Sequence, residues 1–179
     1  MQHIKKESVT QPWVKKCPDS YTIRYTENKE PYFLHIKALV GDNCTIGRYT
    51  YLHGNVRVTG LQPLKIGNFC SIANDTTFHC GDEHDTTRIS SYPFETILGM
   101  QLNYSEVQGN GVLIGSDVWI GEGVRILSGS KIGHGVVLGA GCVFKGNAQP
   151  YGIYLGNPAR LLRKRFDEHT IKILMASCW

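Results

Sequence analysis

Residues 114–144 read IGSDVWIGEGVRILSGSKIGHGVVLGAGCVF, and an apolar residue recurs in this stretch at every sixth position. A period of six fits neither the 3.6 residues of a helical turn nor the two-residue alternation of one long strand. It is the repeat of a parallel β-helix, in which each hexad supplies one short strand and one corner. Glycine, which tolerates corner geometry, often follows the apolar member. The members are Ile114, Ile120, Ile126, Ile132, Leu138 and Phe144.

The same step occurs earlier in the chain, in two shorter series. Three hexads make one triangular coil, so we expect residues eighteen apart to stack, with Ile114 against Ile132 and Ile120 against Leu138. The count is broken at residues 56–63, where the chain either bulges out or shifts its frame. The two earlier series are Val40, Ile46, Leu52 and Ile66, Ile72, Phe78.

A second and longer break covers residues 79–111, whose sixfold positions are mostly polar. We expect this segment to leave the coil as an excursion loop. Long loops inside compact domains are usually functional, and this one begins with the polar sequence HCGDEHD at residues 79–85.

The predicted fold is therefore an all-β parallel β-helix over residues 39–156, with the excursion at 79–111 and two terminal segments. Residues 1–38 form an N-terminal cap segment, in which YTIRYT (21–26) alternates like a strand. Residues 157–179 form a C-terminal α-helical segment, with Asn157 as N-cap, Pro158 as first helical residue, and apolar positions for one face. Those positions are Leu161, Leu162, Phe166, Ile171, Leu174 and Met175.

Composition excludes several classes of protein. Nineteen Lys and Arg against fifteen Asp and Glu give a formal charge of +4, too small to indicate a nucleic-acid partner. No membrane-length apolar run or leader pattern is present, so we expect a cytoplasmic protein without membrane contact. The six cysteines form no CxxC pair, so neither a disulfide framework nor a zinc ribbon is indicated.

Four stretches stand out: LKIGNFCSIA (64–73), HCGDEHDTTRISSYPF (79–94), residues 114–144, and YLGNPARLLRKRFDEHTI (154–171). Together they resemble the hexapeptide-repeat acetyltransferases, and within them the xenobiotic acetyltransferase branch, which includes streptogramin, type B chloramphenicol and many saccharide O-acetyltransferases. The resemblance implies left-handed coils, the exception to the usual right-handed crossover. It also implies a homotrimer with active sites between subunits, and direct acetyl transfer from acetyl-CoA to a hydroxyl.

The family's catalytic histidine falls on His84, whereas His79 has no counterpart. A neutral imidazole is suited to take the proton of an attacking alcohol and pass it to the departing thiolate, so we expect His84 to act as general base. A carboxylate at Asp82, Glu83 or Asp85, or a main-chain carbonyl, could orient the ring.

A metal site is the competing interpretation, because γ-class carbonic anhydrases share this architecture and place two zinc histidines five apart, as His79 and His84 are. In those enzymes the third ligand lies about two coils before the pair, which here corresponds to Asn43 or Arg48, and neither residue suits zinc. His53 becomes a possible third ligand only if residues 56–63 bulge out and are omitted from the spacing. We therefore expect no metal.

The remaining candidates concern acetyl-CoA and the acceptor. Glu122 and Ala140 are eighteen apart, so they share a corner on successive coils. The resemblance places them beside acetyl-CoA and places three cations near its phosphates, for which such side chains are suited. The cations are Lys145, Arg160 and Arg163.

Two aromatic residues are candidates for the acceptor site. Trp119 precedes the inward-facing Ile120, so its side chain points outward, and it resembles the tryptophan that packs beside the neighbouring subunit's histidine. Tyr51 resembles a tyrosine that lines the acceptor site.

These expectations describe an acetyl-CoA-dependent O-acetyltransferase acting on a hydroxyl of a saccharide-type acceptor, since the loop from His84 to Tyr92 resembles saccharide-modifying members in length. Acetylation of an antibiotic of streptogramin or chloramphenicol type is the alternative with the same chemistry. A non-catalytic β-helix scaffold is the alternative of another class, which would need neither His84 nor the arginines.

Overall fold

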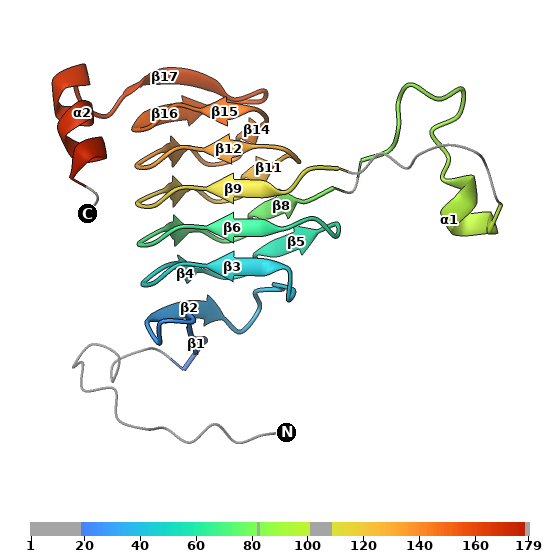
Figure 1. Ribbon diagram of the computed structural model, residues 1–179, viewed down its shortest axis with the longest axis horizontal. Coiled ribbons are helices and arrows are strands. Elements are labelled where there is room, and N and C mark those ends of the chain that lie inside the picture. The colour runs from blue at the N-terminus through green and yellow to red at the C-terminus, as the bar shows by residue number, and fades with distance from the viewer. Residues whose placement is uncertain (1–18, 82, 101–108, 178–179) are drawn as a thin grey trace.

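The computed structural model describes residues 19–81, 83–100 and 109–177, and its short strands wind into a parallel β-helix of stacked coils (Figure 1). Three sheets form its sides. The five-stranded sheet contains β15 (Asn147–Ala148), β12 (Lys131–Ile132), β9 (Val112–Ile114), β6 (Leu64–Ile66) and β3 (Cys44–Ile46). The four-stranded sheet contains β14 (Val143–Phe144), β11 (Arg125–Ile126), β8 (Thr77–His79) and β5 (Arg57–Thr59). The eight-stranded sheet contains β1 (Tyr21–Tyr25), β2 (Pro31–His35), β4 (Tyr51–Leu52), β7 (Ser71–Ile72), β10 (Trp119–Ile120), β13 (Val137–Leu138), β16 (Gly152–Leu155) and β17 (Arg160–Lys164).

The core consists of columns of inward side chains, one column for each sheet. Ile114 pairs with Ile132, and Ile120 with Leu138, which confirms the stacking predicted from the eighteen-residue spacing. Ile120 and Leu138 are completely buried. Burial of such a side chain contributes about 1.5–3 kcal/mol, so the repeated apolar position is the main stabilising feature of the coil.

The break at residues 56–63 is a shift of frame. In the lower coils paired strands are twenty residues apart, as Tyr51 and Ser71 are, two more than in the upper coils. Residues 57–59 remain an ordinary strand, in register with Thr77–His79. The extra residues therefore lie at the corner after β5, and the inward columns continue past them.

Antiparallel strands close both ends of the eight-stranded sheet. β1 pairs with β2 at one end, which confirms the strand predicted at residues 21–26, and β17 pairs with β16 at the other. The predicted helical start at Asn157 and Pro158 is wrong, because residues 160–164 are this final strand. Without β17, the last parallel strand β16 would present an unpaired edge, which favours aggregation, and β17 covers that edge. Leu161 and Leu162 consequently lie exposed rather than on a buried helical stripe.

The C-terminal helix α2 (Glu168–Ala176) is shorter than expected. Asp167 is its N-cap, and the side chain accepts a hydrogen bond of 2.8 Å from the Thr170 amide. Ile171 is buried, as its place in the apolar pattern predicts. No helix of the described residues has the length and apolarity needed to cross a bilayer.

The predicted excursion is present between β8 and β9, but His79, its expected first residue, still belongs to β8. It projects sideways from the coil and carries the short helix α1 (Phe94–Leu98) near its far end (Figure 1). The loop therefore leaves from the corner at which the four-stranded sheet meets the five-stranded one.

Candidate active site

The excursion loop leaves the coil through a narrow neck. Cys80, which is completely buried, is the last residue of the chain before the neck, and Gly81 and Gly109 form its two sides. A Cβ atom on Gly109 would lie only 2.2 Å from the Gly81 Cα. Glycine is therefore required for the outgoing and returning chains to pass this closely.

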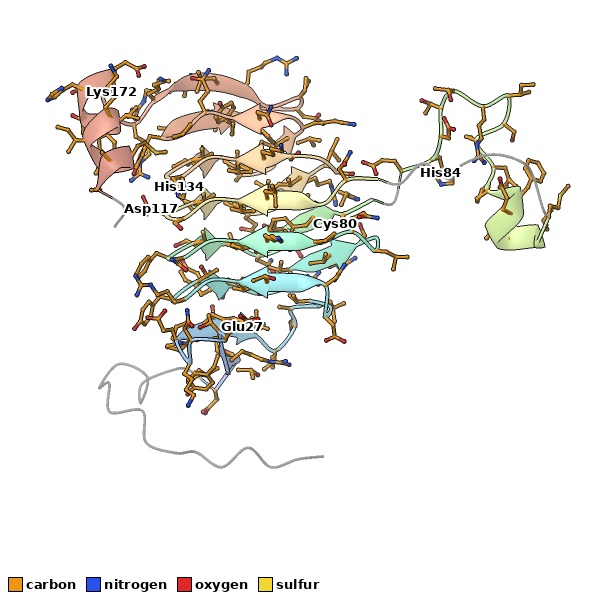
Figure 2. The ribbon with its side chains drawn as sticks, viewed as in Figure 1. Glu27, Cys80, His84, Asp117, His134 and Lys172 are labelled. Carbon is orange, nitrogen blue, oxygen red and sulfur yellow. The ribbon has the colours of Figure 1, made fainter. Side chains whose placement is uncertain are left out.

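His84 lies beyond the neck, well out on the projecting loop, with its side chain exposed (Figure 2). Its Nδ1 atom is 2.7 Å from the main-chain carbonyl oxygen of Ser91. A carbonyl oxygen only accepts hydrogen bonds, so in this geometry Nδ1 carries the proton of the neutral ring. The Nε2 atom then has a free lone pair, which is the arrangement that a general base needs.

Asp85 does not orient His84, although it is the adjacent residue. Its carboxylate accepts hydrogen bonds from the Thr87 amide at 2.9 Å and the Thr87 hydroxyl at 2.7 Å. Together with the positive charge of Arg88, these bonds lower the pKa of Asp85 below its usual value. Of the partners left open by the sequence, Ser91 provides the contact to His84, and Asp82 lies outside the described residues.

Arg88 joins the two halves of the loop. Its Nε atom is 3.3 Å from the Asp85 carboxylate, and its Nη1 atom is 3.0 Å from the Glu95 carboxylate in α1. Sequence reasoning missed this role, and the available signal was the spacing of an acid three residues before the arginine and another seven residues after it.

The histidines of the metal interpretation occupy separate elements. His79 ends β8, and its Nδ1 lies 3.2 Å from the Thr59 hydroxyl. His53 follows β4 in the eight-stranded sheet and makes a hydrogen bond with the Tyr21 hydroxyl. In the part of the chain that the structure describes, no cluster of three or more His, Cys, Asp or Glu residues could hold a metal ion.

Tyr51 and Trp119 lie on the outer face of the eight-stranded sheet, in one column with Ser71 between them. Two strand spacings separate them, or about 10 Å between Cα atoms. Their exposed fractions are 41% and 58%, respectively. The outward direction predicted for Trp119 is confirmed, and this face presents two aromatic rings to the surroundings.

Glu122 and Ala140 share a corner of successive coils, next to β10 and β13. The Gly141 amide donates to the Glu122 carbonyl at 2.7 Å, which confirms the predicted stacking. Both side chains are exposed, and the Glu122 carboxylate lies 3.4 Å from the Asn74 amide nitrogen. Glycine flanks both residues on each side, as Gly121, Gly123, Gly139 and Gly141.

The predicted phosphate-binding cations differ in their surroundings. Arg160 and Arg163 are exposed on β17, and each donates one bond of 3.1 Å to a neighbouring main-chain carbonyl. Lys145 is exposed after β14, on the corner above the excursion. The next two basic residues along the chain are paired: Lys164 forms an ion pair with Glu168, and Arg165 forms one with Asp117. Those two cations are therefore committed to contacts within the chain.

A single chain does not bring all these residues together. Tyr51, Trp119, Glu122 and Ala140 lie on the eight-stranded sheet or its corner, whereas the loop of His84 projects from a different corner (Figures 1 and 2). A separate groove of about 500 Å³ over the five-stranded sheet contains none of them. Its lining includes Leu113, Ser116, Lys131, His134 and Asn147.

The comparisons with known proteins agree with this architecture. Residues 111–146 match the family model described as bacterial transferase hexapeptide (six repeats). A chloramphenicol acetyltransferase of Agrobacterium fabrum is 33% identical over 164 residues, which cover 80% of this chain and 78% of the relative.

Two solved structures share the fold. A hexapeptide-repeat containing acetyltransferase from Vibrio cholerae has a TM-score of 0.60 and 28% identity, and covers 71% of this chain. A galactoside acetyltransferase in complex with coenzyme A has a TM-score of 0.60 and 26% identity, and covers 79%. The matched regions span 65% and 63% of those two solved chains. The Vibrio protein has also been solved with acetyl-CoA.

Proposed function

The chain belongs to the hexapeptide-repeat acetyltransferases, and from this premise we propose that it transfers the acetyl group of acetyl-CoA to a hydroxyl of a saccharide-type acceptor, with His84 as general base. The observation that carries the proposal is the bond between His84 Nδ1 and the Ser91 carbonyl. It leaves Nε2 as the only ring nitrogen able to accept a proton.

The chemistry requires one proton to move twice. As the acceptor oxygen attacks the thioester carbonyl, Nε2 of His84 takes the hydroxyl proton. The tetrahedral species then collapses, the C–S bond breaks, and the imidazolium returns the proton to the CoA thiolate. The products are the acetyl ester and CoA, and the imidazole ends in its starting state.

The split arrangement of the candidates supports a homotrimer. The loop of His84 projects away from its own coil, and the outer face with Tyr51 and Trp119 belongs to another side of the molecule. In the proposed assembly, His84 of one subunit faces Trp119 of the next. Sedimentation velocity should accordingly give one species of three chains, and a monomer that retains activity would contradict this arrangement.

Acetyl-CoA is proposed to lie along the corner of Glu122 and Ala140. Main-chain groups at this corner suit the pantetheine amides, and Arg160 and Arg163 on β17 supply charge for the phosphates. Lys145, which lies on the corner above the excursion, is proposed to add charge from that side. The Glu122 carboxylate would stay turned toward Asn74. A similar solved structure containing coenzyme A supports the use of this co-substrate.

The saccharide acceptor is favoured by the length of the loop and by the aromatic pair. Flat rings such as those of Tyr51 and Trp119 pack against the apolar face of a sugar while leaving its hydroxyls free. The galactoside acetyltransferase among the similar structures is consistent with this class. An antibiotic acceptor is the second candidate, since the relative at 33% identity is a chloramphenicol acetyltransferase.

Two measurements together separate the saccharide acceptor, the antibiotic acceptor and the scaffold. Calorimetric titration with acetyl-CoA should give one site per subunit, and chromatography should detect CoA released with a panel of saccharides and chloramphenicol. Acetylation of sugar hydroxyls that is lost in His84→Ala, with acetyl-CoA binding retained, is the expected result. Turnover with chloramphenicol alone would select the second candidate. No acetyl-CoA binding by the folded protein would favour a scaffold.

A further inference from the structure

The loop that carries His84 is closed by two sets of contacts. The first is the bond between His84 Nδ1 and the Ser91 carbonyl, at 2.7 Å. The second is Arg88, whose guanidinium contacts Asp85 at 3.3 Å and Glu95 at 3.0 Å. Both sets join the beginning of the same segment to its end.

Arg88 is not an ordinary surface cation. Its side chain is 18% exposed, and those of Asp85 and Glu95 are each 19% exposed. The Nη1 atom of Arg88 donates a hydrogen bond to Glu95, and its Nε atom forms an ion pair with Asp85; a single ammonium group would reach both carboxylates less well. Without Arg88, the partly buried carboxylates of Asp85 and Glu95 would lose the cation that they share.

The sequence positions of these contacts connect them to His84. Asp85 is the residue after His84, and Glu95 stands four residues after Ser91 in the first turn of α1. Arg88 therefore connects the residue that follows His84 to the helix that begins at Phe94, shortly after Ser91.

We propose that Arg88 is a positioning residue that holds the Ser91 carbonyl against Nδ1 of His84 and so fixes the ring in the tautomer required for catalysis. The inference rests on the proposed function. Arg88 contacts Asp85 and Glu95 of its own loop, so in this proposal it acts through His84 and not on the substrates.

The test measures the tautomer directly. In protein labelled with ¹⁵N-histidine, two-bond ¹H–¹⁵N correlation spectra at a pH where the imidazole is neutral should show His84 protonated at Nδ1. In Arg88→Gln we expect a substantial population protonated at Nε2. Arg88→Lys, which keeps the charge without the fork, should lie between the two. Thr86→Ala, at an exposed position in the same loop, is the matched control and should leave the spectrum unchanged.

Activity supplies the second readout. A misplaced imidazole should lower kcat by up to about 100-fold in Arg88→Gln, with the KM for acetyl-CoA unchanged. An unchanged tautomer in folded Arg88→Gln and Arg88→Lys would overturn the positioning role and leave His84 as base intact. Full activity of His84→Ala would instead contradict the proposed function, and the spectra would still decide whether Arg88 controls the ring.

Discussion

The side chain of His84 is oriented by the main chain of Ser91, with Nδ1 and the carbonyl oxygen 2.7 Å apart. The contact therefore does not depend on the serine hydroxyl. We predict that Ser91→Ala keeps kcat within about threefold of the unmodified protein, because a main-chain acceptor survives the substitution.

His84→Ala, in contrast, should lower kcat by roughly 100- to 10,000-fold, the usual contribution of a general base. Steady-state kinetics with an accepted sugar would compare the two variants. A loss in folded Ser91→Ala as large as that in His84→Ala would show that the hydroxyl, and not the carbonyl, is the important group.

Arg160 and Arg163 lie on the strand that closes the eight-stranded sheet, with exposed guanidinium groups. Each substitution by alanine should weaken acetyl-CoA binding about tenfold, since a charge-assisted hydrogen bond contributes about 1.5–3 kcal/mol and exposure reduces it. Calorimetry at low and high salt is the measurement, and the difference should shrink as salt is added. Lys172→Ala removes an exposed cation of α2 as the control; equal weakening there would mean that net charge alone is responsible.

Leu138 is completely buried in the column beneath the eight-stranded sheet. Leu138→Ala should lower the free energy of unfolding by about 2–5 kcal/mol, because the rigid coil cannot collapse into the space left behind. Val137 is the neighbouring residue on the same strand, and its side chain points outward. Urea unfolding at one protein concentration would compare the two alanine variants, and a similar loss in Val137→Ala would contradict the inward column as the main source of stability.

Arg165 fastens the C-terminal segment to the coil. Its Nη1 atom donates to the Asp117 carboxylate at 2.9 Å and the Gly135 carbonyl at 2.8 Å, and the guanidinium lies over the rings of Tyr151 and Phe166. Arg165→Ala should lower the free energy of unfolding by about 1.5–3 kcal/mol and increase amide hydrogen exchange in α2. Arg165→Lys should give values of both quantities between those of the unmodified protein and Arg165→Ala. Unchanged exchange in α2 with the alanine variant would mean that Ile171 alone holds the helix.

Burial raises the pKa of the Cys70 thiol to about 11, despite hydrogen bonds that act in the opposite direction. The thiolate, which is the reactive form, is therefore scarce at pH 8, roughly one molecule in a thousand. Peptide mapping after brief iodoacetamide treatment should find Cys70 unmodified in the native protein and modified in urea. Rapid native labelling at pH 8 would show that the core opens at this position.

The sequence predicted the coil because its determinants are local and repeated. One apolar residue in six must face inward in every coil, so the strands of the coil, an excursion between β8 and β9, and the stacking of Ile120 on Leu138 followed from spacing alone. For residues 157–164 the local pattern predicted a helix, and that prediction was wrong. Their helical signals were overridden by the open edge of β16, a partner that no local pattern reveals.

The candidate site divides in the same way. The sequence predicted that His84 lies in the excursion loop, that Trp119 points outward, and that Glu122 and Ala140 share a corner of successive coils. The ring contact with Ser91 and its connection through Arg88 to Glu95 were decided only by the tertiary structure. A periodic pattern specifies which side of a coil a residue faces, whereas the path of an irregular loop depends on contacts among residues with no fixed spacing.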